Sequence, residues 1–416
     1  MPSDRIYLCL AQMSKDGLEQ KYIQEAFDTN WVVPLGPNVN GFEADLEKFV
    51  GFQKKVVALS SCTAAIHLAL LALGVGQGDE VLCPSFSFCA SSNPVTYCGA
   101  KPVFVDSELD TWNMDPALLE QAIQDRMDKT GKKPKAIIVV DLYGMPAHWE
   151  KLERIGKQYD IPIIEDAANA LGSLYKGKPC GSFGQLGTFS FNGNKMITTS
   201  GGGALVCNDD ETKKRIVFLS TQAREPFPYY QHETIGYNYR MSNICAGIGR
   251  GQMSVLKDHI AHHKHLHQRY RELLEDVKGV VLFDNPNADF DSCFWLSTIT
   301  MDPKLSVKGQ KALNTSCEPN PNVEALRIYL DQKGIEARPL WKPMHKQPVY
   351  QGVERGELSV ESLSNGIVRQ TSDRSVSYIS GISEQLFRTG MCLPSGPCVS
   401  DEDVHYIVDC IKAAIG

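Results

Sequence analysis

The stretch Gly187-Thr-Phe-Ser-Phe-Asn-Gly-Asn-Lys-Met-Ile-Thr-Thr-Ser-Gly-Gly-Gly203 sets a lysine between an apolar run and a triple glycine. Aromatic and β-branched residues up to Phe191 predict a strand that ends at Asn192-Gly193. Lys195 therefore projects from a turn, and a second strand is predicted at 204–207. A desolvated lysine on a rigid turn can form a Schiff base, and small residues beside it let a cofactor approach the backbone. A surface lysine in a glycine-rich loop is the commoner alternative.

A carboxylate follows a second apolar run. Residues 161–164 are wholly apolar, which predicts a strand buried on both faces of a parallel sheet, and Glu165 and Asp166 stand at its carboxyl end. Ligand sites of open α/β sheets lie outside the carboxyl ends of the strands. An Asp there, paired with a distant lysine such as Lys195, is typical of pyridoxal 5'-phosphate sites, because the Asp keeps the pyridine nitrogen protonated. Alone, Glu-Asp after a strand is a common loop opening.

A phosphate-binding helix start is predicted upstream. A strand-like run at 56–59 leads through small residues into a mostly apolar helix at 65–73. Free backbone N–H groups and the helix dipole favour an anion at such a start. Cys62 and Thr63 would donate to a phosphate, and Ser190 is an additional hydroxyl ligand. An ordinary Ser/Thr N-cap would look the same in this stretch alone.

Together these segments closely resemble the sugar aminotransferases of the DegT/DnrJ/EryC1/StrS family, a branch of the fold-type-I pyridoxal phosphate enzymes, along nearly the whole chain. Further similar blocks are 34–36, 78–81, 84–88, 101–106, 142–144, 181–184 and 236–240. The blocks most similar to bacterial 4-aminotransferases of UDP-linked 4-keto-6-deoxy-N-acetylhexosamines are 192–203, 220–225, 338–345 and 392–396. The resemblance implies transfer of an amino group from L-glutamate to C4 of such a sugar, for surface glycan biosynthesis.

The resemblance also assigns cofactor contacts. It implies that Lys195 forms the Schiff base and that Asp166 partners the ring nitrogen. Phe88 would pack on one face of the ring, with Ala168 a candidate for the other. The phosphate contacts that it implies are Cys62, Thr63 and Ser190.

Two departures and one shared contact complete this assignment. Asn169 stands where the family often has Gln, so its contact with the ring hydroxyl would be shorter or indirect. Asp141 replaces a frequent family His before Leu-Tyr-Gly, and the sequence gives it no role. Asn238 would reach in from the neighbouring subunit, because family active sites form across a homodimer interface.

The candidate substrate residues lie inside or beside family-like blocks. Arg224, Arg240 and Arg338 are suited to the donor carboxylate or the sugar diphosphate, because a guanidinium matches both with two parallel hydrogen bonds. Ion pairs are an equally good explanation of each arginine. Trp341 and His345 are candidates for the sugar pocket, although packing in the core is the commoner role for both.

Composition narrows the class of protein. The 416 residues, with 43% hydrophobic and 22% charged content, suit a large enzyme with substantial cores. A net charge of −7 gives no basic signature for nucleic acid. Neither an export signal nor an apolar run of the roughly twenty residues that span a bilayer is found. Thirteen cysteines without a Cys-x-x-Cys pair favour reduced thiols and a cytoplasmic location.

Two domains are predicted. Residues 1–250 would form an N-terminal arm and a large cofactor-binding domain, and 251–416 a linking helix and a smaller α+β domain. The predicted strands of the large domain, besides 56–59, are 81–83, 102–105, 136–140, 161–164, 187–191 and 204–207. Helical patterns such as 115–127 and 147–158 alternate with them, which predicts an α/β fold with a mostly parallel, seven-stranded-type sheet flanked by helices. One long helix is predicted at about 240–276, followed by a strand at 295–300 and a helix near 322–333.

The linking helix carries histidines whose spacing requires a zinc site to be considered: His259, His262, His263, His265 and His267. No Glu or Cys completes a catalytic cluster nearby, so we expect a solvated helix face and no metal. Two polar stretches, 304–321 and 352–381, are predicted to be surface loops. The second is long enough to be a lid over the nucleotide, and a merely decorative loop is the alternative.

Three other functions stay open. A sugar 3-dehydratase of the same fold carries His where this chain has Lys195, which disfavours that activity. Transamination could instead occur at C3 of the sugar or on another nucleotide. A non-catalytic sensor or scaffold that binds the cofactor or a nucleotide-sugar is disfavoured by the pairing of Lys195 with Asp166.

Overall fold

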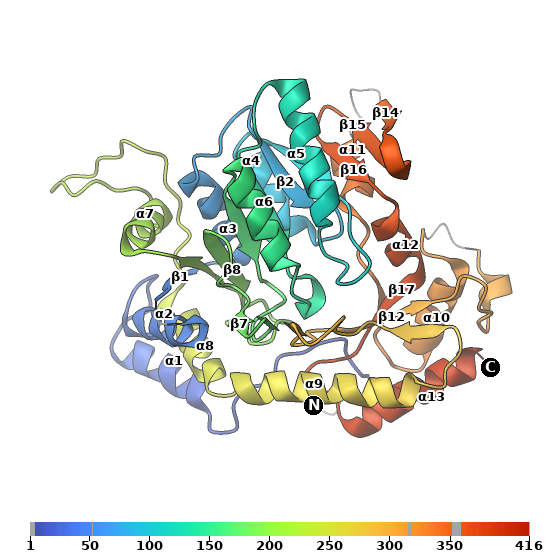
Figure 1. The fold of residues 1–416 in the computed structure, drawn as a ribbon. Coiled ribbons are helices and arrows are strands. Elements are labelled where there is room, and N and C mark those ends of the chain that lie inside the picture. The colour runs from blue at the N-terminus through green and yellow to red at the C-terminus, as the bar shows by residue number, and fades with distance from the viewer. Residues whose placement is uncertain (1–4, 52, 315–317, 352–358, 416) are drawn as a thin grey trace.

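A ten-stranded sheet with helices on both faces forms the centre of the molecule, seen in a computed structural model that describes residues 5–51, 53–314, 318–351 and 359–415 (Figure 1). Its strand order is β1-β9-β8-β5-β4-β2-β3-β16-β15-β14. The first seven strands in that order are β1 (Lys55–Leu59), β9 (Gly203–Cys207), β8 (Leu186–Ser190), β5 (Ile163–Asp166), β4 (Ala136–Val140), β2 (Glu80–Pro84) and β3 (Lys101–Val105). Strands β8, β5, β4, β2 and β3 pair in parallel, and β9 is antiparallel to both its neighbours. The predicted α/β class and mostly parallel sheet are confirmed.

Two hydrophobic cores lie on the two faces of this sheet, because successive strand residues point to opposite sides. Val56 and Ile137 pack in the core that includes α2, α5 and α6, whereas Val57 and Ile138 pack in the core that includes α3 and α7. The helices of this part are α1 (Leu18–Asp28), α2 (Pro37–Val50), α3 (Cys62–Ala72), α4 (Asn93–Tyr97), α5 (Pro116–Thr130), α6 (Trp149–Tyr159), α7 (Asp210–Ser220) and α8 (Asn243–Met253).

A second, antiparallel sheet has the strand order β10-β12-β17-β13 and shares a third core with three helices. Its strands are β10 (Val280–Leu282), β12 (Ser297–Met301), β17 (Gly390–Leu393) and β13 (Arg338–Pro339). The helices of this core are α9 (Leu256–Leu274), α10 (Pro321–Gln332) and α13 (Asp401–Ile415). Further elements are two shorter helices, α11 (Pro348–Gln351) and α12 (Ile382–Thr389), and a small sheet of β6 (Leu174–Tyr175), β7 (Lys178–Pro179) and β11 (Phe290–Asp291). No helix in the described part of the chain has the length and apolar character needed to cross a bilayer.

The single linking helix predicted at 240–276 is two helices, α8 and α9. The amides of Ser254 and Val255 bond back to the carbonyls of Gly251 and Gln252 and close α8 there. Its glycines permit close packing on the N-terminal helices, since a Cβ on Gly251 would lie 2.6 Å from the amide nitrogen of Glu19 in α1. Helix α9 then runs along the base of the molecule to the second sheet (Figure 1).

The prediction of a surface loop at 352–381 is wrong for its described part. Strands β14 (Ser359–Ser362), β15 (Val368–Thr371) and β16 (Val376–Ile379) extend the large sheet, with β16 parallel to β3. Tyr378 is fully buried and its hydroxyl donates to Asp125 at 2.5 Å, while Arg369 pairs with the same carboxylate. Residues beyond 251 therefore contribute to both sheets, because the chain returns to the large one after visiting the small one.

The histidine-rich face of α9 is mostly a packing face. His259, His263 and His267 are buried, and the Nδ1 atoms of the first two lie 3.1 and 3.2 Å from the carbonyl oxygens of Met196 and Phe294. Burial lowers the pKa of all three imidazoles, that of His263 to about 3. None of them belongs to a cluster with metal-ligand spacing among the described residues. These side chains pack α9 against Met196 and against the segment that leads into β12.

The carboxylate of Asp141 is buried at the end of β4. Its Oδ1 accepts hydrogen bonds from the amide of Ala147 and the indole N–H of Trp149, both at 2.9 Å. Its Oδ2 is buried and has no partner among the described residues. Oxygen and sulfur atoms of Glu165 and Cys180 lie within 4.8 Å of this carboxylate. Asp141 thus faces a second acid.

Glu165 is the other half of a buried acid pair. Its two oxygens accept from the amides of Gly181 at 2.5 Å and Phe183 at 2.6 Å. Burial, and then the neighbouring Asp141, raise the pKa of Glu165, and burial raises the pKa of Asp141. Two like charges this close in a dry interior cannot both ionise readily, so the pair holds one proton. The pair adjoins Asp166: Glu165 precedes it in the chain, and the amide of Asp141 donates to the Asp166 carbonyl at 3.1 Å.

The acid pair makes stability depend on pH. The folded protein keeps a proton that the unfolded chain releases above its ordinary carboxyl pKa, so the free energy of unfolding falls as pH rises from about 4 through the raised folded pKa. In Asp141→Asn the side-chain amide cannot ionise. We therefore expect the free energy of unfolding of this variant to fall by on the order of 2 kcal/mol less between pH 5 and pH 8. Denaturant unfolding at a series of pH values measures this. Asp110→Asn, at a largely exposed carboxylate, is the control, and a slope in Asp141→Asn equal to that of the unsubstituted protein would contradict the shared proton.

Candidate active site

A cavity of about 780 Å³ opens at the carboxyl ends of β1, β5 and β8 and is also lined by residues at or beside β12, β13 and β17 of the small sheet. The predicted site residues that line it are Cys62, Thr63, Phe88, Asp166, Ala168, Asn169, Ser190, Lys195, Arg338 and Trp341. They come together because carboxyl ends of parallel strands meet at one edge of a sheet. None of the described residues 359–379 lines the cavity, so within one chain the lid interpretation of that stretch has no support.

Lys195 lies on the turn after β8. Its amide bonds to the carbonyl of Asn192 at 3.0 Å and closes the turn, and its Nζ donates to Oδ1 of Asn169 at 2.5 Å. On the other side, the amine lies 4.0 Å from the ring centroid of Trp295. Burial of the amine lowers the pKa of Lys195 to about 8, although the carboxylate of Asp166 opposes the change. An amine with this pKa is uncharged far more often near neutral pH than an exposed lysine, and so is a better nucleophile.

Asp166 ends β5 and is almost fully buried. Its Oδ2 accepts from the hydroxyl of Ser91 at 2.6 Å, and its Oδ1 from the amide of Ala168 at 3.1 Å and the thiol of Cys62 at 3.8 Å. Burial raises the pKa of Asp166, and these donors together with the charge of Lys195 oppose that rise. The side chain of Cys62 therefore contacts the carboxylate, which leaves only its backbone for the predicted phosphate contact.

The start of α3 borders the same cavity. The Ser61 side chain caps the helix, and the amides of Cys62 and Thr63 precede its internal hydrogen bonds. Ser190 pairs with Gly203 across β8 and β9. A Cβ on Gly203 would lie 2.3 Å from the amide nitrogen of Cys62, so glycine is needed for the strand to pass this close to the helix start.

These groups fit pyridoxal phosphate. A lysine amine, a buried carboxylate and a helix N-terminus border one cavity, and they match the aldehyde, the ring nitrogen and the phosphate of that cofactor. Phe88 and Ala168 also line the cavity, as expected of residues that pack on a ring. Asn169 bonds to the lysine amine in this structure, and its predicted contact with the ring hydroxyl stays a prediction.

Three of the predicted substrate residues, Arg224, Arg240 and His345, do not line the cavity, and the last two have hydrogen-bond partners elsewhere in the chain. The guanidinium of Arg240 donates to Glu43 at 2.7 Å. The buried ring of His345 bridges the hydroxyl of Ser85, 2.6 Å from Nδ1, and the carboxylate of Glu384, 3.1 Å from Nε2. In a single chain both side chains hold structure together rather than face the cavity.

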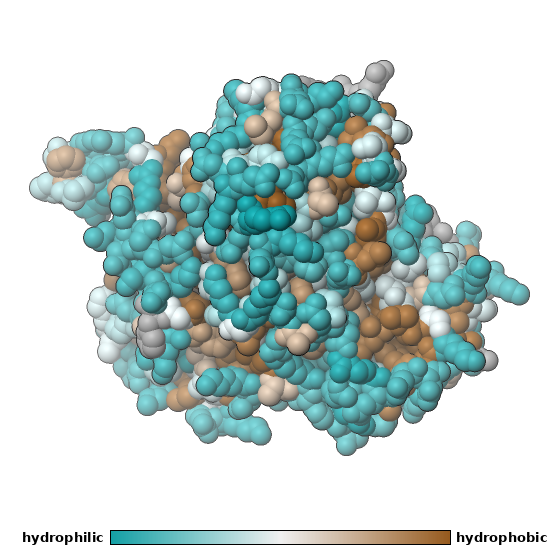
Figure 2. All heavy atoms as spheres, in the orientation of Figure 1, coloured by the Kyte–Doolittle hydropathy of each residue, from teal (hydrophilic) through white to brown (hydrophobic). Residues whose placement is uncertain are grey.

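Arg224 and Asn238 lie on residues 221–240, here called the projecting segment. The middle of the segment stands clear of the body beyond α7 (Figures 1 and 2), whereas its two ends lie against the body, where Thr221 bridges Asn238 and Arg240 bridges Leu59. The guanidinium of Arg224 lies 4.2 Å from the ring centroid of Tyr230, and Asn238 is exposed. Neither residue lines the cavity of its own chain.

Several cavity residues were not predicted from sequence. Ser91 holds Asp166, Trp295 covers Lys195, and Cys9 and Lys342 also line the cavity. Lys342 lies inside the family-like block at 338–345 and Ser91 just past the block at 84–88, which are local signals that could have found them. Cys9 and Trp295 come from segments distant in sequence that only the fold brings close.

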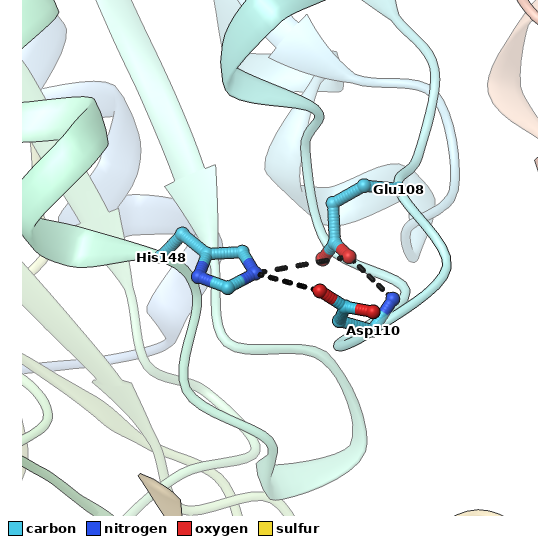
Figure 3. A group of neighbouring side chains, drawn as sticks. All are labelled: Glu108, Asp110 and His148. Atoms are coloured by element: carbon cyan, nitrogen blue, oxygen red, sulfur yellow. Dashed lines mark hydrogen bonds and ion pairs between the residues drawn. The ribbon is translucent and has the colours of Figure 1, made fainter. Parts of the chain in front are cut away.

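A separate cluster brings Glu108 and Asp110, in the turn after β3, next to His148 at the start of α6 (Figure 3). Nε2 of His148 points at the carboxylates of Glu108 and Asp110, 3.8 Å from each. Both Glu108 oxygens already accept the amide of Thr111 at 3.1 Å. We therefore assign the cluster to stabilisation of the turn.

Comparisons with known proteins agree with the site. The profile of the DegT/DnrJ/EryC1/StrS aminotransferase family matches residues 13–412. EpsN of Bacillus subtilis, named as a candidate pyridoxal phosphate-dependent aminotransferase, is 43% identical over 405 residues, 97% of this chain and 94% of EpsN. GDP-perosamine synthase of Escherichia coli O157:H7 is 35% identical over 408 residues, 98% of each chain. The crystal structure of a DegT DnrJ EryC1 StrS aminotransferase from Brucella abortus matches with a TM-score of 0.82 and 27% identity, covering 96% of each chain.

A matching family profile over most of the chain, close relatives over its full length and a cavity that fits the cofactor all agree. The chain therefore belongs to the DegT/DnrJ/EryC1/StrS family and is a fold-type-I, pyridoxal phosphate-dependent nucleotide-sugar aminotransferase.

Proposed function

We propose that this enzyme transfers the amino group of L-glutamate to C4 of a UDP-linked 4-keto-6-deoxy-N-acetylhexosamine, for surface glycan biosynthesis. The observation that carries transamination is the buried amine of Lys195 bordering the same cavity as the carboxylate of Asp166. The choice of sugar rests on the blocks 192–203, 220–225, 338–345 and 392–396. One of these blocks contributes Arg338 and Trp341 to the cavity lining.

The side chains divide the work of the reaction. Pyridoxal phosphate, held by Lys195, Asp166 and the start of α3, supplies an electron sink for the carbon that loses its proton. Lys195, as a free amine, takes that proton and later returns one, and a pKa of about 8 lets it act as base and as acid near neutral pH. Asp166 keeps a positive charge at the ring nitrogen favourable. The two half-reactions share one cavity, which predicts ping-pong kinetics.

Positive side chains at the cavity are suited to the diphosphate of the sugar nucleotide. Arg338 pairs with Glu336 at 2.9 Å, yet its side chain is 67% exposed and can turn toward a ligand. Lys342 also lines the cavity and pairs with Glu318. We assign the diphosphate to Arg338, because its planar guanidinium can bond two phosphate oxygens at once, and the sugar ring to Trp341.

We also propose a homodimer with shared active sites. The projecting segment carries exposed aromatic and aliphatic side chains, including Tyr229, Tyr230 (78% exposed) and Ile235 (80%). Several large apolar side chains exposed together on one short segment favour an interface, whereas a single one does not. In the dimer, Arg224 and Asn238 of this segment reach the cavity of the partner subunit, where Asn238 contacts the cofactor and Arg224 the substrate.

A second candidate substrate is a keto-sugar linked to GDP. The similarity to GDP-perosamine synthase over 98% of the chain favours it. The motifs around Lys195 and Asp166 serve either nucleotide, because the cofactor contacts the sugar end of the substrate. Direct comparison of the two substrates decides between them.

Absorbance spectroscopy tests the reaction and its substrate. We expect L-glutamate to remove the visible band of bound pyridoxal phosphate and UDP-4-keto-6-deoxy-N-acetylglucosamine to restore it. Lys195→Ala should fold normally and abolish turnover, whereas Lys157→Ala, at an exposed lysine, should behave as the unsubstituted enzyme. Restoration only by a GDP-linked keto-sugar would replace the proposed substrate. Turnover in Lys195→Ala would contradict the mechanism itself.

Light scattering tests the dimer. We expect the unsubstituted protein to have the mass of two chains, and Ile235→Asp to dissociate it and lower kcat, because a buried unpaired charge is costly at an interface. Val281→Asp places the same charge at another exposed aliphatic position, 64% exposed on β10, and should leave the mass unchanged. A monomeric and fully active unsubstituted protein would refute shared active sites.

A further inference from the structure

The indole of Trp295 covers the amine of Lys195. Trp295 lies between β11 and β12, so the segment leading into the second sheet delivers it to the cavity. The Nζ of Lys195 is 4.0 Å from the ring centroid, and only 3% of Trp295 is exposed. An ammonium over the face of a tryptophan is attracted by the ring quadrupole, most strongly where water is excluded.

The same side chain also holds the backbone of the lysine turn. Its indole N–H donates to the carbonyl of Asn194, the residue before Lys195, at 2.7 Å. The next contact in the turn is the 3.0 Å bond from the Lys195 amide to the carbonyl of Asn192. Trp295 thus contacts the lysine at its amine and beside its backbone, which fixes both ends of a flexible side chain.

Trp295 is itself held firmly. Its ring stacks on Tyr143 with centroids 6.5 Å apart and an interplanar angle of 16°. The ring centroid of Trp341 lies 6.3 Å from that of Trp295. Gly144, at φ 99°, lets its backbone pass close to that of Trp295, since a Cβ on Gly144 would lie 3.0 Å from the amide nitrogen of Trp295. A ring supported in this way offers a fixed surface.

Groups other than Trp295 also act on the amine of Lys195. Asn169 accepts a hydrogen bond from it, and Asp166, Cys62 and Cys9 are the titratable groups that act on its charge. The uncharged indole adds attraction for the ammonium without adding a second negative charge. It also excludes water, so it favours one position for the amine.

We propose that Trp295 is a positioning residue of the transamination. Its ring face receives the ammonium of Lys195 whenever the lysine is not joined to the cofactor, and its N–H fixes the turn below. The lysine then waits beside the reacting carbon and does not swing into the cavity. This role differs from that of an aromatic residue that only fills space, because it depends on the π face and on the indole N–H.

Two substitutions separate these contributions. Trp295→Phe keeps an aromatic face and removes the N–H bond to Asn194. Trp295→Leu removes both, and Trp295→Met is a second variant without a ring, to be used if the leucine variant folds poorly. Trp112→Leu, at a buried tryptophan that stacks on Phe283 outside the cavity, is the control.

The first readout is the pH profile of the rate at which cofactor-free full-length protein recombines with pyridoxal phosphate, whose midpoint reports the amine of Lys195. We expect the midpoint in Trp295→Leu and Trp295→Met to lie roughly half to one unit below that of Trp295→Phe, because the face that stabilises the ammonium is gone. Trp112→Leu should keep the midpoint of the unsubstituted protein.

The second readout is steady-state kinetics of the holoenzyme. A positioning role lowers kcat in the order unsubstituted, Phe, Leu, with little change in KM for glutamate, because the proton transfer and not the binding is affected. Equal midpoints and equal kcat values in the Phe, Leu and Met variants would overturn the proposal and leave Trp295 as packing only.

Discussion

The buried carboxylate of Asp166 is the constraint around which the molecule is arranged. A carboxylate out of water is unfavourable unless hydrogen bonds or a cation stabilise it. Ser91, the Ala168 amide and Cys62 supply hydrogen bonds from three different elements, and Lys195 adds a positive charge across the cavity. These partners are in place only when β1, β5 and β8 end at the same edge of the sheet. The parallel order of the strands is therefore a requirement of the site, and a protonated ring nitrogen would supply the cation directly.

Much of this arrangement could be predicted, because its signals are local. Apolar runs of four or five residues correspond to strands buried on both faces, as in β4 and β5. Small residues before an apolar helix mark the start of α3, and a lysine between a strand and three glycines marks the turn of Lys195. Strand ends carry the chemistry in such sheets. Lys195, Asp166 and Thr63 were therefore placed at one cavity without any coordinates.

The rest depends on pairings between distant segments. Strands β14 and β15 are short and polar, and β16, although buried, has only four residues. They form strands because β16 pairs with β3, β15 with β16 and β14 with β15, so sequence predicted a loop. Arg240 and His345 look like ligand residues until Glu43 and Glu384 are seen beside them. Asp141 had no role that the sequence could assign, because the fold alone brings the buried Glu165 beside it. None of these partners has a fixed sequence spacing.

The position of Trp295 shows why the second sheet matters to the chemistry. Segments of the large sheet and its helices supply the lysine, the carboxylate and the helix start, but the indole over the amine comes from the segment before β12 and the guanidinium of Arg338 from β13. Both reach the cavity from one small sheet with its own core. A movement of that sheet would therefore displace the lysine cover and the proposed diphosphate contact together.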